Sequence, residues 1–120
     1  MSQKRGTKSE FVIVWEFRVR PSKRRAFERA YGPDGDWARF FCTGKGYIRT
    51  ELFSDRETPL RYLTLDFWAS RMDYERFKKE NRAEYQAIDK KCESLTEKEV
   101  EIGKFALCPG RPTRPDVSGS

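Results

Sequence analysis

Apolar side chains alternate with other residues over nine positions near the start of the chain. Every odd-numbered position in this stretch is large and apolar: Phe11, Ile13, Trp15, Phe17 and Val19. Because successive side chains of a strand point to opposite faces, this period of two predicts a β-strand with one strongly apolar face. The even-numbered positions include Val12, Val14, Glu16 and Arg18. That second face is too apolar for open water and too charged for an ordinary core.

The rest of the chain predicts three helical segments and three further strands. The expected elements are a helix over 22–31, a short helical piece over 37–41, strands over 47–54 and 60–68 joined by a loop over 55–59, a long helix after Ser70, and a strand over 99–107. Ser70 and Asp73 are spaced to cap the long helix reciprocally. Its inward stripe is expected at Phe77, Asn81, Tyr85, Ile88, Cys92 and Leu95.

This order of elements predicts an α+β domain with the ferredoxin-like βαββαβ plan. In that plan an antiparallel four-stranded sheet carries its helices on one face. The other face then needs a cover, and a second copy of the sheet in a twofold dimer supplies one. We therefore predict a homodimer through the open sheet face. A chain of 120 residues accommodates one such domain, which we place at 10–107 between flexible polar tails at 1–9 and 108–120.

The positive net charge of +6 lies mostly outside the predicted domain. Residues 1–9 contain three basic residues and no acid, and residues 108–120 contain two basic residues and one acid. The predicted domain therefore contains 20 of the 25 basic residues and 18 of the 19 acidic residues, a net charge of +2. The charged residues of the helix over 76–84 alternate in sign, which is typical of a solvent-exposed helix face. No nucleic-acid-binding motif accompanies them. We expect no nucleic-acid partner.

Targeting and redox signals favour a cytoplasmic protein. The longest apolar run, Phe11 to Trp15, is far shorter than the roughly 20 residues of a membrane helix, and no apolar segment follows the basic N-terminus as in a secretory signal. Cys42, Cys92 and Cys108 are odd in number and have no CxxC spacing, which predicts reduced thiols. We expect no membrane association.

The chain contains no histidine, which excludes several chemistries. A Ser-His-Asp triad, a Cys-His pair, histidine-bound zinc and histidine-ligated haem are all ruled out. The commonest general base at neutral pH is missing too. We predict no metal and no cofactor.

Four segments resemble the antibiotic biosynthesis monooxygenase superfamily. These are Val14-Trp15-Glu16-Phe17, the stretch from Ala30 to Arg39 (AYGPDGDWAR), Gly46-Tyr47, and the stretch from Tyr62 to Ser70 (YLTLDFWAS). The resemblance spans about residues 10 to 106 and implies a dimeric α/β-barrel. The superfamily includes oxygenases that need no cofactor and haem-degrading enzymes; the haem branch depends on a helix histidine and a first-strand asparagine, both missing here.

The residues themselves suggest a site between sheet and helices. The candidate catalytic residues are Trp68, Asn81 and Asp66, and the candidate substrate-binding residues are Tyr62, Tyr74, Phe77, Tyr85 and Trp37. Structural alternatives are core or interface packing for Trp68, a helix cap or an outward-facing position for Asn81, and packing for Tyr74 and Tyr85. Asp66 is either a base whose pKa burial raises, or a structural partner of Arg18 or Arg49.

Two functions remain open on this evidence. The first is a cofactor-independent monooxygenase that acts on a hydrophobic aromatic substrate of quinol or polyketide type. Such an enzyme must desolvate and orient an electron-rich substrate and stabilise the developing oxyanion. The second is a non-catalytic module that binds a small aromatic ligand or acts as an accessory protein with the same fold. Whether the protein is an enzyme is therefore left open by the sequence.

Overall fold

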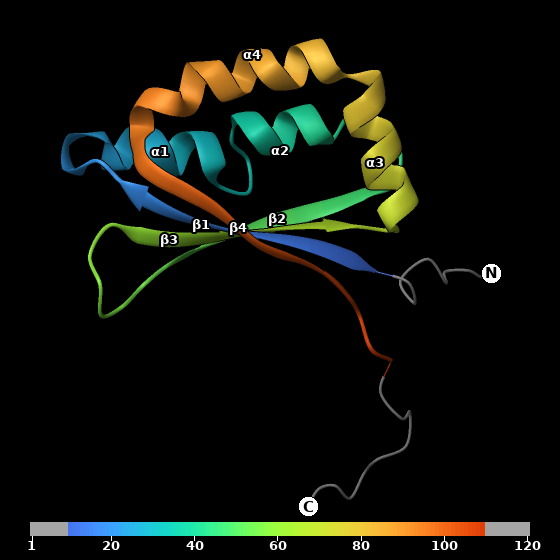
Figure 1. Ribbon diagram of the computed structural model, residues 1–120, viewed down its shortest axis with the longest axis horizontal. Helices are drawn as coiled ribbons and strands as arrows, with labels where there is room; N and C mark the ends of the chain where they lie inside the picture. Colours follow the sequence, from blue (N-terminus) through green and yellow to red (C-terminus); the bar gives the residue numbers. More distant parts are fainter. Residues whose placement is uncertain (1–9, 110–120) are drawn as a thin grey trace, which may run out of the picture.

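A computed structural model describes residues 10–109 as one antiparallel sheet covered by helices on one side (Figure 1). The strands are β1 (Phe11–Val19), β2 (Tyr47–Ser54), β3 (Arg61–Trp68) and β4 (Thr96–Ala106), in the order β2-β3-β1-β4. Each pairing in this order is antiparallel. The predicted α+β class and ferredoxin-like plan are confirmed. The predicted tails at 1–9 and beyond residue 109 lie outside the described residues.

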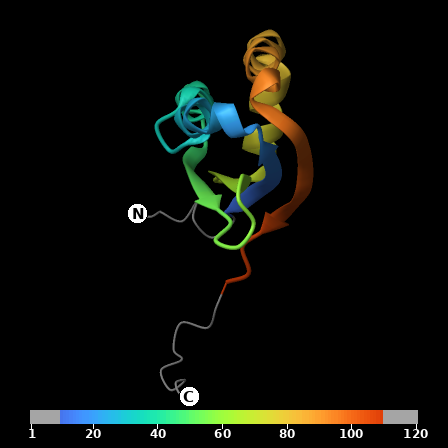
Figure 2. The same cartoon turned by 90° about the vertical axis from the view of Figure 1, so that its left-hand side faces the viewer.

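The helices form two stacks over the same sheet face (Figure 2). One stack holds α1 (Arg24–Tyr31), which follows the short 3-10 turn η2 (Pro21–Lys23), and α2 (Asp36–Phe41). The other holds α3 (Arg71–Glu80) and α4 (Arg82–Cys92), with η3 (Glu93–Leu95) leading into β4. Within residues 10–109, no helix is long and apolar enough to cross a membrane.

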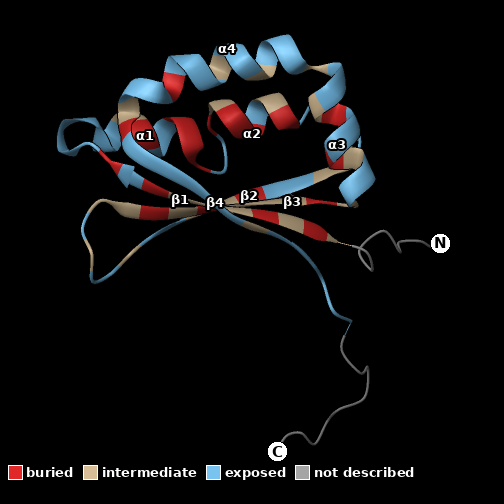
Figure 3. Ribbon diagram, viewed as in Figure 1, coloured by how far each residue is buried: buried red, intermediate tan, exposed pale blue. Residues whose placement is uncertain are grey.

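The alternation at 11–19 produces the core side of β1. Phe11, Ile13, Phe17 and Val19 are buried, and Trp15 is partly buried against the same cluster. Aromatic rings from α1, α2 and β3 pack onto these side chains. The ring centroids of Phe27 and Tyr31 in α1, for example, lie 5.2 Å and 4.8 Å from that of Phe17. Figure 3 shows this buried layer between sheet and helices. Ten of the fourteen buried residues in this core cluster are aromatic.

The predicted long helix is interrupted at Asn81. This residue has φ −125° and ψ 35°, which is not helical, and it ends α3 and precedes α4. Its side-chain Nδ2 donates to the Phe77 carbonyl oxygen at 2.9 Å, a bond of the kind by which asparagine competes with the helical backbone. The chain therefore turns here, and α3 and α4 run in different directions (Figure 1). The apolar stripe predicted for one long helix continues across Asn81, so the sequence pattern does not show that the helix is interrupted there.

The opposite sheet face carries no helix and mixes charged with apolar side chains. Arg61 joins Glu16 at 2.7 Å and Asp55 at 2.8 Å. Exposed apolar side chains on strands include Phe53, Val100 and Phe105, whose cross-strand partners are Leu63, Glu16 and Val12. The second face of β1 is thus neither a solvated surface nor a closed core, as its sequence predicts.

Candidate active site

A cavity of about 270 Å³ lies between the sheet and the helices. Its walls are largely aromatic side chains, contributed by β1, α1, α2 and α4: Trp15, Phe17, Tyr31, Trp37, Phe41 and Tyr85. Trp37 and Tyr85 meet edge to face with centroids 5.0 Å apart. The volume is close to the lower end of the range of about 300 to 1,000 Å³ for small-molecule sites, so a ligand of one to three fused rings suits it.

One carboxylate lies among the polar groups that β2 and β3 contribute to the cavity. Asp66 and Thr64 from β3 and Thr50 from β2 line it, and Thr50 is paired with Asp66 in the strand register. The Thr50 hydroxyl donates to Asp66 Oδ1 at 2.6 Å. The Tyr47 hydroxyl lies 2.7 Å from Thr50 Oγ1. Because a hydroxyl has one proton, Tyr47 donates to Thr50 when Thr50 donates to Asp66.

Asp66 has the electrostatics of a base that works near neutral pH. Burial raises its pKa from the ordinary value of 3.8 to about 6, and the hydrogen bond from Thr50 opposes this rise. A carboxylate with a pKa near 6 is mostly ionised at pH 7 yet holds a proton well. Within residues 10–109, Asp66 has no ion pair, and Arg18 and Arg49 instead join Glu16 and Glu51. The structural pairing considered for Asp66 is therefore not formed.

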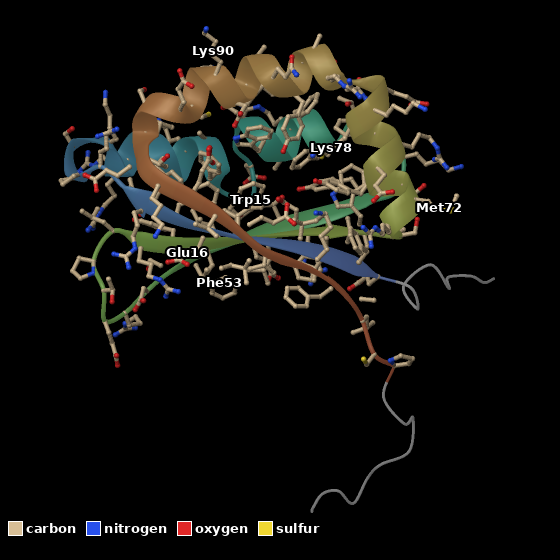
Figure 4. All side chains as sticks on the ribbon, viewed as in Figure 1. Trp15, Glu16, Phe53, Met72, Lys78 and Lys90 are labelled. Carbon is tan, nitrogen blue, oxygen red and sulfur yellow. The ribbon has the colours of Figure 1, made fainter. Side chains whose placement is uncertain are left out.

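A single ammonium group lines the cavity among its described residues. Lys78 of α3 reaches toward the sheet (Figure 4), with its Nζ 4.8 Å from the Tyr85 ring centroid and 5.5 Å from that of Tyr74. Cation–π contacts of this kind hold a lysine without a carboxylate partner. The other charged residues of the lining besides Asp66 are acidic: Asp89, Glu99 and Glu101.

The predicted site residues separate into three groups. Asp66, Tyr85 and Trp37 line the cavity. Trp68, Phe77 and Tyr62 are buried in the core, and the Tyr62 hydroxyl donates to the Glu28 carboxylate of α1. Tyr74 is buried and lines a neighbouring groove, whereas Asn81 lies at the break between α3 and α4.

Trp68 is completely buried behind the cavity. Its ring packs edge to face with Phe41, Tyr47 and Tyr74 at centroid distances of 5.5 to 5.7 Å. Its Nε1 has no hydrogen-bond partner among the described residues. Trp68 thus supports the Tyr47 and Phe41 rings from behind and does not line the cavity.

Most of the cavity lining was not identified from the sequence, and Trp15, Thr50 and Lys78 are the members with a role in the site. Trp15 was assigned only to the core face of its strand, although that same alternation places it beside Phe17 and so over the cavity. Thr50 carried no signal, because its role depends on the pairing of β2 with β3. Lys78 resembled its charged helix neighbours and became distinguishable only through the fold. Within residues 10–109, no group of three acidic or cysteine side chains is arranged to hold a metal ion.

Residues 10–91 match the family described as antibiotic biosynthesis monooxygenase. No curated protein is significantly similar to the sequence.

Several solved structures share the fold. SnoaB, a cofactor-independent oxygenase from Streptomyces nogalater, is 19% identical with a TM-score of 0.64, covering 88% of this chain and 99% of its own. A conserved protein from Methanosarcina mazei is 13% identical with a TM-score of 0.66, covering 83% of this chain and 94% of its own. A protein from Pseudomonas aeruginosa is 13% identical with a TM-score of 0.61, covering 86% and 98%. Since the family match spans most of the chain, this protein belongs to the antibiotic biosynthesis monooxygenase family.

Proposed function

We propose that the protein is a cofactor-independent oxygenase that acts on an electron-rich aromatic substrate of the quinol or anthrone type. The observation that carries this proposal is Asp66, a carboxylate with a pKa of about 6 in an aromatic-walled cavity. The fold shared with the Streptomyces nogalater oxygenase supports it.

The chemistry follows from what the side chains do to a bound phenol or anthrone. The aromatic walls hold the ring and exclude water, and Asp66 takes the acidic proton of the substrate. Lys78 provides positive charge near the resulting anion. The electron-rich anion then transfers an electron to O₂.

The overall reaction balances without a further reductant. For an anthrone, one O₂ is consumed for each substrate molecule. One oxygen atom becomes the new carbonyl of the quinone, and the other leaves as water with the two hydrogens lost from the oxidised carbon. The substrate itself supplies the electrons.

The residues behind the cavity have supporting roles in this proposal. Trp68 and Phe77 pack against the wall residue Phe41, and Tyr62 packs against Phe27, which stacks on the wall residue Tyr31. Tyr74 packs beside Lys78, and Asn81 turns the chain between α3 and α4. Direct contact with the substrate is assigned to Asp66, Trp37 and Tyr85. We expect Trp68→Phe and Asn81→Ala to reduce activity mainly through stability.

The proposal extends to the assembly and its location. We infer a homodimer in which the open sheet faces of two copies pack together, because Phe53, Val100 and Phe105 leave that face apolar while Arg61, Glu16 and Asp55 supply fixed charges for register. The cytoplasmic location expected from the cysteines is kept as part of this proposal.

Oxygen uptake with a panel of anthrones and hydroquinones tests the function. We expect uptake above autoxidation with the wild-type protein, and a loss on the order of 100-fold or more in Asp66→Asn. Binding of these compounds without uptake above autoxidation would instead favour the non-catalytic binding module.

A further inference from the structure

A second groove lies directly beside the cavity and has the opposite charge. Its volume is about 690 Å³, and it shares Lys78, Tyr85 and Asp89 with the cavity, so the two adjoin at these residues. Five basic side chains line the groove: Arg71, Lys78, Lys79, Arg82 and Lys104. Only Glu75 and Asp89 oppose them. The cavity, in contrast, has four carboxylates and one ammonium group.

The basic side chains of this groove are not all engaged by neighbouring acids. Arg71 pairs with Glu75 at 2.8 Å, and Lys104 pairs with Glu101 at 2.5 Å. Among the described residues, Lys78, Lys79 and Arg82 have no carboxylate within ion-pair distance. These three cations come from the end of α3 and the start of α4, which the turn at Asn81 brings to one groove. The remainder of the domain is nearly neutral, so this concentration of free positive charge is local.

We propose that the ligand of the cavity carries an anionic group, a carboxylate or a phosphate, which binds in this groove at Lys79 and Arg82 beside Lys78. The inference rests on the proposed function in that the aromatic part of the same ligand occupies the cavity. The charge difference orients the molecule, because the acidic residues of the cavity repel an anion and the groove attracts it. The ring then enters first and faces Asp66, while the anionic group stays at the mouth.

Matched ligands separate the contribution of the anion from that of the ring. The test measures dissociation constants of 1-naphthol, 1-naphthoate and 1-naphthyl phosphate from the quenching of tryptophan fluorescence, since Trp15 and Trp37 line the cavity. We expect at least one anionic ligand to bind roughly tenfold tighter than 1-naphthol, as charge-assisted contacts predict. The two anions distinguish a carboxylate site from a phosphate site. Added salt should reduce this advantage.

A double variant assigns the effect to the groove. Lys79→Gln with Arg82→Gln removes two charges from the groove and leaves the cavity lining intact; the matched control, Arg56→Gln with Lys90→Gln, removes two charges from exposed positions outside both pockets. Figure 4 shows Lys90 pointing away from the sheet. We expect the first variant, and not the control, to lose the preference for anions while its affinity for 1-naphthol is unchanged.

The outcomes distinguish this inference from the proposed function. Equal affinity for all three ligands, or an anion preference that survives in the groove variant, would overturn the inference and leave the cavity site standing. Failure of every ligand to bind would overturn the inference together with the proposed aromatic site.

Discussion

At the scale of single residues, the decisive group is Asp66. Burial raises its pKa from 3.8 to about 6, so the folded protein binds this proton more tightly than the unfolded chain does. The stability it contributes is therefore complete below its ordinary value and is lost as the pH rises through about 6. A residue that costs stability at neutral pH and lies in a cavity fits a functional role better than a structural one.

Replacement of Asp66 by asparagine should stabilise the protein at neutral pH. We expect the free energy of unfolding at pH 7.5 to rise by on the order of 1 to 3 kcal/mol, with little gain near pH 4. Urea unfolding at the two pH values measures this. Asp55→Asn is the control of opposite sign, because backbone hydrogen bonds and Arg61 lower the pKa of Asp55 and its stabilisation is present at neutral pH. If the Asp66→Asn variant is less stable than the wild-type protein at pH 7.5, the proposed burial cost of the Asp66 carboxylate is contradicted.

The hydrogen bond from the Thr50 hydroxyl should lower the pKa of Asp66. Thr50→Val keeps the shape of the side chain and removes the donor at 2.6 Å, so the pKa of Asp66 should rise above about 6. Titration of the Asp66 carboxyl carbon by NMR reports this without any substrate. Thr64 also lines the cavity but does not donate a hydrogen bond to Asp66, so Thr64→Val is the control and should leave the pKa of Asp66 unchanged. An unchanged pKa in Thr50→Val would show that the hydrogen bond does not influence the carboxylate.

At the scale of elements, the start of β2 is held against α3 by a glycine. Gly46 has φ +94°, a conformation that side chains rarely adopt, and a Cβ there would meet the Asp73 carboxylate. Gly46→Ala should therefore reduce the free energy of unfolding by about 1 to 3 kcal/mol. Thermal unfolding measures the change, with the neighbouring exposed Lys45→Ala as control. Equal stability of the two variants would contradict this description of the turn.

The elements also show what could be predicted from the sequence. The alternation at Phe11 to Val19 predicted β1 correctly because it depends only on local geometry, and Ser70 caps α3 as predicted by accepting from the Asp73 backbone N–H at 3.1 Å. Asp73 does not complete a reciprocal cap, since its carboxylate pairs with Arg76. The break at Asn81 was missed because its cause is a side-chain bond to Phe77, which apolar periodicity does not record. Likewise β4 begins at Thr96, not at residue 99.

The site was only partly predictable for the same reason. Asp66 was found because an acid on an apolar strand face is visible in the sequence. Thr50 acts through a hydrogen bond between two strands, and Lys78 acts through a contact between α3 and α4. Those contacts exist only in the folded chain, so no local pattern marked them.

At the scale of the whole molecule, the open sheet face predicts self-association. Phe53→Glu places a charge in the apolar part of that face, where Phe53 is 51% exposed, and should shift the dimer toward monomer at micromolar concentration. Met72→Glu is the matched control, because Met72 is 70% exposed on α3, away from the open face (Figure 4). Sedimentation velocity measures both. A wild-type protein that is monomeric would remove the proposed dimer.

The arrangement of charge over the molecule supports one functional picture. An aromatic cavity with acidic walls adjoins a basic groove on the side of the sheet that carries the helices, while the opposite face is open to the proposed second copy. In the proposed dimer, the ligand and the partner would therefore use opposite sides of one sheet. This separation lets the dimer form without closing the cavity.

The most direct test of the central claim is the pH dependence of oxygen uptake with an anthrone, corrected for autoxidation, in the wild-type protein and in Asp66→Asn. If Asp66 is the base, the wild-type kcat/KM rises with pH through about 6 and then levels off, because the carboxylate must be ionised to accept the proton. The asparagine variant should retain at most about one hundredth of the wild-type rate and lose that dependence. A wild-type profile without a rise near pH 6, or an asparagine variant with wild-type turnover, would contradict the account.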